Sequence, residues 1–178
     1  MKLFRRVRGL ERPVIALDEF RLDGWLPEDA AAHRRFALDP DVARFFGWTV
    51  EQAASAPDSH YDDVIARFAR EWHEETRFSL AVRGCSDGEA VGSVELRLTG
   101  READVSYMVA SDLRGQGLVS RALTALIAWG TRELGLQRVN LACHIDNAAS
   151  RRVAEKCGFA FVGRVGDELR FRRNTRPA

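Results

Sequence analysis

Apolar residues recur every three or four positions over residues 119–130, which is the spacing of one buried face of an α-helix. Just upstream, residues 104–109 are rich in β-branched and aromatic side chains, which favours a strand. Gly115 and Gly117 lie in the short loop between the two. The pattern therefore predicts a strand, a glycine-containing loop and a helix in direct succession.

The rest of the chain divides into elements by the same reasoning. Strands are predicted over 14–22, 78–83, 90–98 and 138–145, and helices over 27–38 and 61–75, with Asp39–Pro40 as a break. Thr49 and Gln52 predict a capping box. Asp146 or Asn147 would cap a last helix that Gly158 ends. This mixture predicts one α+β (mixed α/β) domain over residues 1–178.

The predicted strand, loop and helix together make an anion site. The first N–H groups of a helix lack intrahelical partners, the helix dipole favours negative charge there, and glycines allow a close approach. Arg114 adds a positive charge. The loop lacks the Lys-Ser/Thr ending of a P-loop and the third glycine of the dinucleotide fingerprint. Taken alone, it could equally be a tight strand-to-helix turn.

A second stretch, residues 146–159, narrows the choice. With it, the chain resembles the GNAT acetyltransferases, and within them the RimJ/RimL type that acetylates ribosomal-protein N-termini. Residues 114–119 match the family pattern Arg/Gln-x-x-Gly-x-Gly/Ala, except that Val119 replaces the last small residue, and residues 103–108 resemble the strand before it. The family segment Asn-x-x-Ser…Glu-Lys-x-Gly-Phe matches Asn147, Ser150, Glu155, Lys156, Gly158 and Phe159. The resemblance is strongest over residues 90–161.

The resemblance implies a GNAT-like fold, in which helices flank a central, mostly antiparallel twisted sheet. It implies acetyl-CoA as cosubstrate and a primary amine as acceptor. The exposed strand backbone at Tyr107, Met108 and Val109 would then hold the pantetheine arm and the thioester carbonyl. The loop residues that would hold the pyrophosphate are Arg114, Gly115, Gln116, Gly117, Leu118, Val119 and Ser120. Asn147 would contact the pantetheine arm, and Lys156 would contact a phosphate.

Acetyl transfer also needs a proton donor for the leaving thiolate and a base for the amine. The resemblance implies Ser150 as the donor, although a first-turn serine also suits a purely structural role. Glu95, Asp104 and Glu168 are the candidate bases; each alone is more often a solvated or paired carboxylate. No tyrosine follows Tyr107, which excludes a C-terminal tyrosine acid. The glutamate-bearing hairpin that usually ends RimJ/RimL proteins is expected to be missing, with a basic tail over 170–178.

Composition limits the class of protein. The chain has 178 residues, of which 46% are hydrophobic and 30% charged, so it can bury a full core. A net charge of +1 argues against attraction of the whole domain to nucleic acid. No apolar run is long enough for a membrane span, and no signal peptide is recognisable. Three cysteines without a Cys-x-x-Cys motif predict a reducing cytoplasm and no metal.

The acceptor is expected to be a protein N-terminus or a small-molecule amine. Its groove would be open, or closed by the first helices or by a second subunit in a homodimer. Acidic residues on the segments beside the groove would favour a cationic amine: Asp39, Asp41, Asp58, Asp62, Asp63, Glu74 and Glu75. Two alternatives stay open. One is a non-catalytic acyl-CoA-binding or sensing domain. The other is a ribosome- or RNA-associated protein that uses the basic residues of 2–8 and 164–176.

Overall fold

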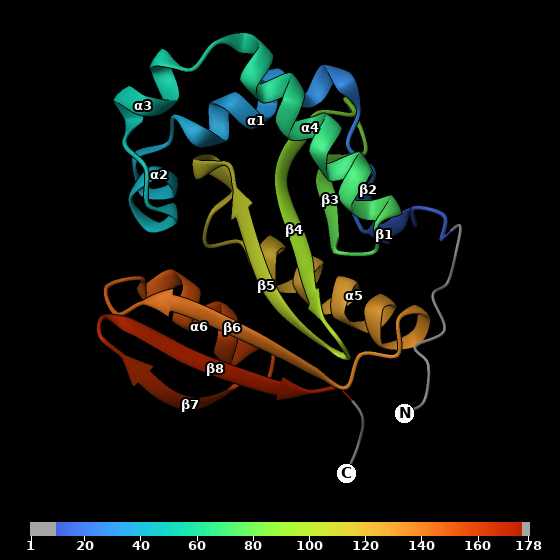
Figure 1. Cartoon of the computed structure of the whole chain (residues 1–178), viewed down its shortest axis with the longest axis vertical. Coiled ribbons are helices and arrows are strands. Elements are labelled where there is room, and N and C mark those ends of the chain that lie inside the picture. The colour runs from blue at the N-terminus through green and yellow to red at the C-terminus, as the bar shows by residue number, and fades with distance from the viewer. Residues whose placement is uncertain (1–9, 176–178) are drawn as a thin grey trace.

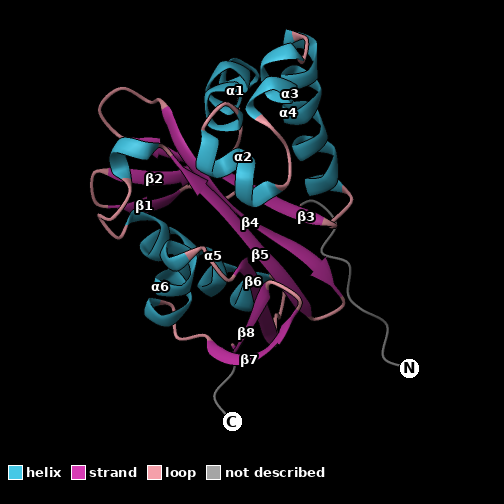
Figure 2. Ribbon diagram, turned by 90° about the vertical axis from the view of Figure 1, so that its left-hand side faces the viewer, coloured by secondary structure: helices cyan, strands magenta, loops and turns pink. Residues whose placement is uncertain are grey.

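A computed structural model describes residues 10–175, which form an eight-stranded sheet with helices on both faces (Figures 1 and 2). The strand order is β1-β2-β3-β4-β5-β6-β8-β7, and β5 and β6 are its one parallel pair in the described part. The strands are β1 (Ile15–Leu17), β2 (Phe20–Asp23), β3 (Arg77–Gly84), β4 (Ala90–Thr99), β5 (Glu102–Val109), β6 (Arg138–His144), β7 (Ala160–Val165) and β8 (Glu168–Asn174). The α-helices are α1 (Ala30–Ala37), α2 (Pro40–Phe46), α3 (Val50–Ser55), α4 (Asp58–His73), α5 (Leu118–Glu133) and α6 (Ala148–Lys156). The predicted mixed fold with a mostly antiparallel sheet is confirmed.

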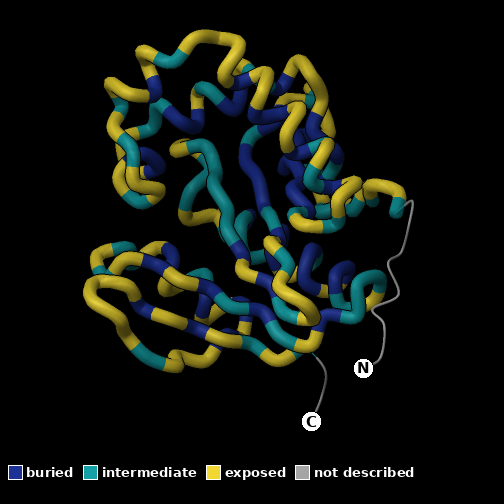
Figure 3. Tube along the Cα trace, viewed as in Figure 1, coloured by how far each residue is buried: buried dark blue, intermediate teal, exposed yellow. Residues whose placement is uncertain are grey.

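One face of the sheet packs on α5 and α6, and its inward residues form the larger core with α5 residues such as Leu123 and Leu126. Gly130 lets α5 approach closely, because a Cβ there would meet Leu96 Cδ1 and Leu136 Cδ1 at 2.8 Å. The helices α1 and α4 cover the β3–β4 half of the opposite face through a second apolar cluster. Figure 3 shows burial concentrated along β3, β4 and α5, while the β7–β8 hairpin is largely exposed.

A buried ion pair fastens the segment before α1 to the sheet. Arg83 on β3 is 2% exposed, and its guanidinium donates to both carboxylate oxygens of Asp29, at 3.0 and 2.6 Å. The same guanidinium also donates to the carbonyls of Gly24 and Gly88. Such a pair holds the α1 segment in one orientation, because removing either partner would leave a buried charge.

The sheet opens between β5 and β6. Their parallel pairing covers only Glu102–Asp104 against Arg138–Asn140, after which the two strands diverge (Figure 1). On its other side, β5 stays paired to β4 over its whole length. The second half of β5 therefore has one edge without a strand partner, and the N-termini of α5 and α6 lie beside this opening.

Several boundaries differ from the predictions. The strand expected over 14–22 is two strands, because Asp18 turns the chain with φ 55°, a conformation that aspartate tolerates. Asp39 is the N-cap of α2 rather than a simple break, and its Oδ1 accepts from the backbone of Asp41 and Val42. The capping box of Thr49 and Gln52 is confirmed, and α4 starts at Asp58.

The expectation that the tail lacks a hairpin was wrong. Residues after Phe159 form the antiparallel pair β7–β8, turned at Gly166 with φ 57°. Leu169 and Phe171 alternate inward into the core, while β8 extends the sheet from β6. The alternative of RNA or ribosome binding relied on the basic residues of 2–8 and of 164–176. Residues 2–8, and the part of the tail beyond Thr175, lie outside the described residues. Among residues 10–175, no helix is long and apolar enough to cross a membrane.

Candidate active site

The loop before α5 presents free backbone at a helix N-terminus, as predicted. Gly115 and Gly117 have φ of 79° and 78°, and a Cβ built on either would meet no atom within 4 Å. Gly117 is the N-cap of α5, so the first N–H groups of that helix have no intrahelical partner. The backbone is therefore accessible from the side where an anion would approach.

A cavity of about 340 Å³, named the loop cavity, lies between this loop, β5, α2 and α6. Twelve of the fourteen residues predicted for the site line it: Tyr107, Met108, Val109, Arg114, Gly115, Gly117, Leu118, Val119, Ser120, Asn147, Ser150 and Lys156. Gln116 does not, because its side chain folds back and donates to the carbonyl of Asp112. Glu95 lies outside this cavity, on the neighbouring face of β4.

Arg114 at the rim of the loop cavity is held by two carboxylates. Its guanidinium lies 2.7 Å from Asp39 and 2.8 Å from Asp41, both at the start of α2. Partial burial would raise the pKa of Asp39, but hydrogen bonds from Arg114 and the α2 backbone outweigh it and lower the pKa. Sequence reasoning placed Arg114 at the anion site but did not find this link to α2.

The side-chain hydroxyls of Tyr107 and Ser150 contact each other in the opening between β5 and β6. The Tyr107 hydroxyl lies 2.5 Å from Ser150 Oγ, and Ser150 is 7% exposed. Burial raises the pKa of Tyr107 well above its ordinary value, with Ser150 as a weaker opposing influence. Asn147 caps α6, as predicted, through its side-chain oxygen and the Ser150 backbone N–H at 2.9 Å. A protonated hydroxyl pair is thus fixed between β5 and α6.

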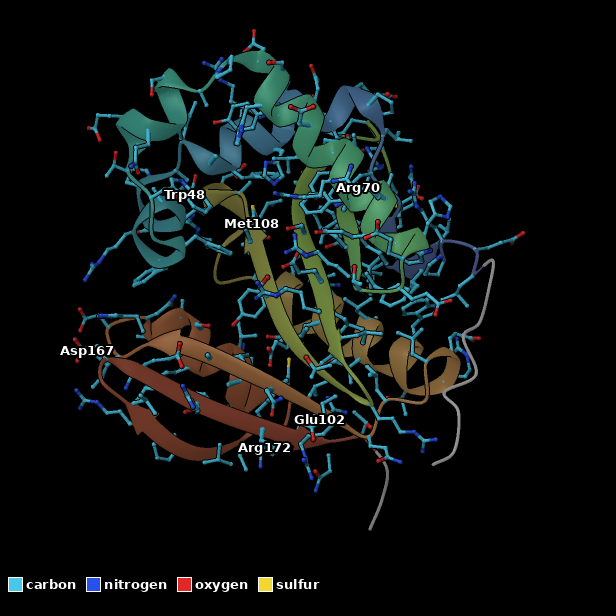
Figure 4. The ribbon with its side chains drawn as sticks, viewed as in Figure 1. Trp48, Arg70, Glu102, Met108, Asp167 and Arg172 are labelled. Atoms are coloured by element: carbon cyan, nitrogen blue, oxygen red, sulfur yellow. The ribbon has the colours of Figure 1, made fainter. Side chains whose placement is uncertain are left out.

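Two further cavities adjoin the loop cavity and share wall residues with it. The strand cavity, of about 790 Å³, extends over β5, β6 and β8, and the helix cavity, of about 500 Å³, lies between β4, β5 and the helices α1, α3 and α4. Tyr107 and Phe46 line these two cavities and the loop cavity as well. Figure 4 shows Met108 on β5 near Trp48, which follows α2; both line the helix cavity. Phe45 and Phe46 of α2 also line the strand and loop cavities, and neither was among the residues predicted for the site.

The three candidate bases fall in different surroundings. Glu95 lines the helix cavity, and its Oε1 accepts from Ser106 Oγ at 2.5 Å, with Arg97 Nε at 3.7 Å. Its side chain is 13% exposed. Asp104 and Glu168 are exposed on the strand cavity, and Glu168 pairs with Arg170 at 3.0 Å. Glu95 is the most enclosed of the three.

The acidic walls predicted for the acceptor groove are absent from these cavities. Of the seven acidic residues proposed, only Asp41 lines any of the three cavities, and that is the loop cavity. The others on α4 and in the turn after it point to solvent or are only partly covered. The sequence placed them on the correct segments, but on helix faces turned away from the sheet. Among residues 10–175, no cluster of His, Cys, Asp and Glu could hold a metal.

Comparison with known proteins agrees with this geometry. The family model described as "Acetyltransferase (GNAT) domain" matches residues 19–160. The Bacillus subtilis protein YdaF, provisionally named a ribosomal N-acetyltransferase, is 27% identical over 118 residues; the match covers 65% of this chain and 63% of YdaF.

Solved structures show the same fold at low sequence identity. The Vibrio fischeri ribosomal-protein-S5-alanine acetyltransferase superposes with a TM-score of 0.80 at 15% identity, covering 92% of this chain and 97% of its own. Mycobacterium smegmatis RimJ, in complex with CoA-disulfide, has a TM-score of 0.78 at 20% identity, covering 92% and 86%. The predicted family, fold and enzyme class are confirmed, and of the three functions left open by the sequence these matches support the acetyltransferase. The chain belongs to the GNAT acetyltransferase family, whose reaction is the transfer of an acetyl group from acetyl-CoA to an acceptor.

Proposed function

We propose that this protein acetylates the α-amine of a peptide or protein N-terminus. The observation that carries this proposal is the position of Tyr107, which lines the loop cavity and the two cavities that adjoin it, and whose hydroxyl bonds Ser150. A donor bound in the loop cavity and an amine bound in either of the other two would meet at this residue. The names of YdaF and of the S5-alanine enzyme support a protein acceptor.

The residues of the loop cavity fit coenzyme A. The open glycine backbone and the free N–H groups of α5 suit a pyrophosphate, and Lys156 and Arg152 add positive charge at the rim. The unpaired edge of β5 offers peptide groups to an amide-containing arm. These features support the predicted roles of residues 107–109 and of the loop, with Gln116 contributing backbone rather than side chain.

Acetyl-CoA supplies the acetyl group as a thioester. In our proposal, Ser150 gives its hydroxyl proton to the departing sulfur, and Tyr107, which burial keeps protonated, donates a hydrogen bond to the Ser150 oxygen as that proton leaves. After the products have left, solvent returns a proton to Ser150. Glu95, through a water molecule, would take the proton that the attacking amine loses. Backbone N–H groups beside the opening would stabilise the negative oxygen.

An α-amine suits this site better than a lysine side chain. Its pKa is about 7.7–8.0, whereas that of a lysine ε-amine is about 10.4, so a single carboxylate base has far less deprotonation to accomplish. The rate should therefore rise with pH until the amine is neutral. A small-molecule amine with a similar pKa would meet the same requirement and is the second acceptor class.

Matched peptides test the proposal by mass spectrometry. One peptide has a free α-amine and arginine in place of every lysine; the other is blocked at the α-amine and keeps its lysines. We expect acetylation of the first and not of the second. Acetylation of the α-blocked peptide alone would overturn the proposal.

We also propose a cytoplasmic location. Cys85, Cys143 and Cys157 are free thiols in the structure, and burial raises the pKa of Cys143. Free thiols, one of them exposed, suit a reducing compartment. A homodimer stays a prediction, for which sedimentation of the purified chain is the direct measurement.

A further inference from the structure

Arginine outnumbers acidic residues on the acceptor side of the site. Five arginines and three acidic residues line the strand and helix cavities: Arg67, Arg77, Arg97, Arg170 and Arg172 against Glu95, Asp104 and Glu168. The excess is the opposite of the acidic character that the sequence suggested for this groove. It therefore bears on the charge of the acceptor next to its reactive amine.

A row of side chains crosses four strands on this face. The register places Arg97 opposite Asp104, Asp104 beside Asn140, and Asn140 opposite Arg172. Asn140 accepts from Arg172 Nε at 3.2 Å and faces Asp104 Oδ1 at 3.4 Å. The row ends in a guanidinium on each side, and Figure 4 shows Arg172 on β8 at the lower end.

Two of the three acidic residues that line the strand and helix cavities already lie within ion-pair distance of arginines, whereas two of the arginines have no carboxylate partner in the described part of the chain. Glu168 pairs with Arg170 at 3.0 Å, and Glu95 lies within 4.0 Å of Arg77 and Arg97. Among the described residues, Arg172 and Arg67 have no carboxylate partner within ion-pair distance. The terminal nitrogens of Arg172 stay available to an anion at the edge of the strand cavity, because only its Nε is bonded to Asn140.

We infer that the acceptor carries acidic groups directly after its reactive amine, as an N-terminal segment with Asp or Glu at the second and third residues. This inference rests on the proposed function. The amine would lie near Tyr107, and the next side chains of the peptide would extend over the strand cavity toward Arg172. Arginine binds carboxylates with two parallel hydrogen bonds, so the free end of the Arg172 guanidinium would give both attraction and register.

A peptide fits the cavities better than a small amino acid. The strand and helix cavities, of about 790 and 500 Å³, share Phe46, Ser106 and Tyr107 in their walls and so border one another. Their basic residues lie on elements as far apart as α4 and β8. A single small molecule could not contact both ends, whereas an extended segment could.

The test uses three lysine-free peptides that differ only at residues two and three, as Ala-Asp-Glu, Ala-Asn-Gln and Ala-Arg-Arg, with free aspartate as a small-molecule arm. We expect kcat/KM to fall from the acidic to the neutral to the basic peptide, by about 1.5- to 5-fold per charge pair, the range of exposed ion pairs. Added salt should reduce the difference. Free aspartate should be the poorest acceptor.

Arg172→Gln tests whether Arg172 binds the acidic side chains of the acceptor. This change should reduce the ratio of kcat/KM for the acidic peptide to kcat/KM for the neutral peptide, and should raise KM for the acidic peptide. Arg164→Gln is the matched control, because Arg164 is exposed on β7, pairs with Asp167 and lines none of the three cavities. It removes the same charge and should keep the ratio. An unchanged affinity for coenzyme A shows that each variant is folded.

These measurements distinguish a failure of the proposed function from a failure of the inference about acidic acceptors. If no peptide is acetylated, the proposed function itself fails. If all three peptides are acetylated at equal rates, or the Arg172→Gln and Arg164→Gln enzymes give the same ratio, the inference is overturned and the function stands. Faster acetylation of free aspartate than of the acidic peptide would overturn the choice of a peptide acceptor.

Discussion

The Tyr107 hydroxyl of β5 lies 2.5 Å from the Ser150 hydroxyl of α6, across the opening of the sheet. The backbone brings them together for separate reasons. Tyr107 points to the face of β5 that packs on α5 and α6, as Val105 does two residues earlier, and Ser150 is placed by the Asn147 cap in the first turn of α6. A hydroxyl pair shared by a strand and a helix N-terminus is well placed to deliver a proton.

Ser150→Ala and Tyr107→Phe test this pair. If the hydroxyls protonate the leaving thiolate, each change should lower kcat by about 10²–10⁴-fold, the range of general acid catalysis, with little change in the affinity for acetyl-CoA. The double variant should lose little more than the worse single variant, since the two act as one unit. A small loss of stability with full turnover would instead assign Ser150 a structural role in α6.

The pair also shows where sequence reasoning stops. Both residues could be named from family motifs and helix periodicity, because each lies in a locally recognisable segment. Their contact could not, since it depends on how far β6 diverges from β5, which no local pattern encodes. The same limit explains Arg114, whose partners Asp39 and Asp41 are more than seventy residues away in the chain.

The missed hairpin has a different cause. The alternation of Leu169 and Phe171 with arginines is short, and the excess of charge around it is typical of a tail rather than of a strand. The acidic residues were misplaced because a helix pattern gives the face that is buried but not the direction of the helix over the sheet. Caps such as Asn147 and Thr49 were predictable because they depend only on neighbouring residues.

Substitutions of Gly117 test where the pyrophosphate of coenzyme A binds. Its φ of 78° is tolerated by both asparagine and aspartate, so Gly117→Asn and Gly117→Asp differ in charge at the same backbone strain. Two like charges about 4 Å apart repel by about 4 kcal/mol at an intermediate dielectric constant, so we expect Gly117→Asp to bind coenzyme A at least about tenfold more weakly than Gly117→Asn. Equal affinities, measured by calorimetry on folded proteins, would place the phosphates elsewhere.

Arg114 connects the anion loop to α2 through Asp39 and Asp41, so a bound phosphate would compete with these carboxylates. Asp41→Asn should free Nη1 of the guanidinium, while Asp39 keeps Nη2, and should strengthen coenzyme A binding by about 1.5- to 5-fold, the range of an exposed ion pair. Arg114→Gln should weaken binding. Asp58→Asn, which removes the same charge from an exposed site beside Arg34, is the control and should change nothing. Identical affinities for coenzyme A in all three variants would show that Arg114 pairs only with the carboxylates of α2 and does not contact the bound phosphate.

The buried side chain of His33 should make the stability of the fold sensitive to acid. It is 9% exposed, packs against the rings of Trp25 and Phe68, and its Nδ1 has no hydrogen-bond partner in the described structure. Burial, and then the charges of Arg67 and His60, lower the pKa of His33 from 6.5 to about 4. The folded protein therefore keeps this imidazole neutral in a range where the unfolded chain protonates it.

The direction of the effect is set by proton binding. Between pH 6.5 and about 4 the unfolded state takes up a proton that the folded state does not, so the free energy of unfolding should fall as the pH is lowered through this window. His33→Leu removes the group and the unsatisfied nitrogen, and should flatten that part of the curve. His73→Gln, at an exposed position of α4, is the control and should retain the slope. Urea unfolding at a series of pH values measures both, and a slope that persists unchanged in His33→Leu would refute the assignment of this acid sensitivity to His33.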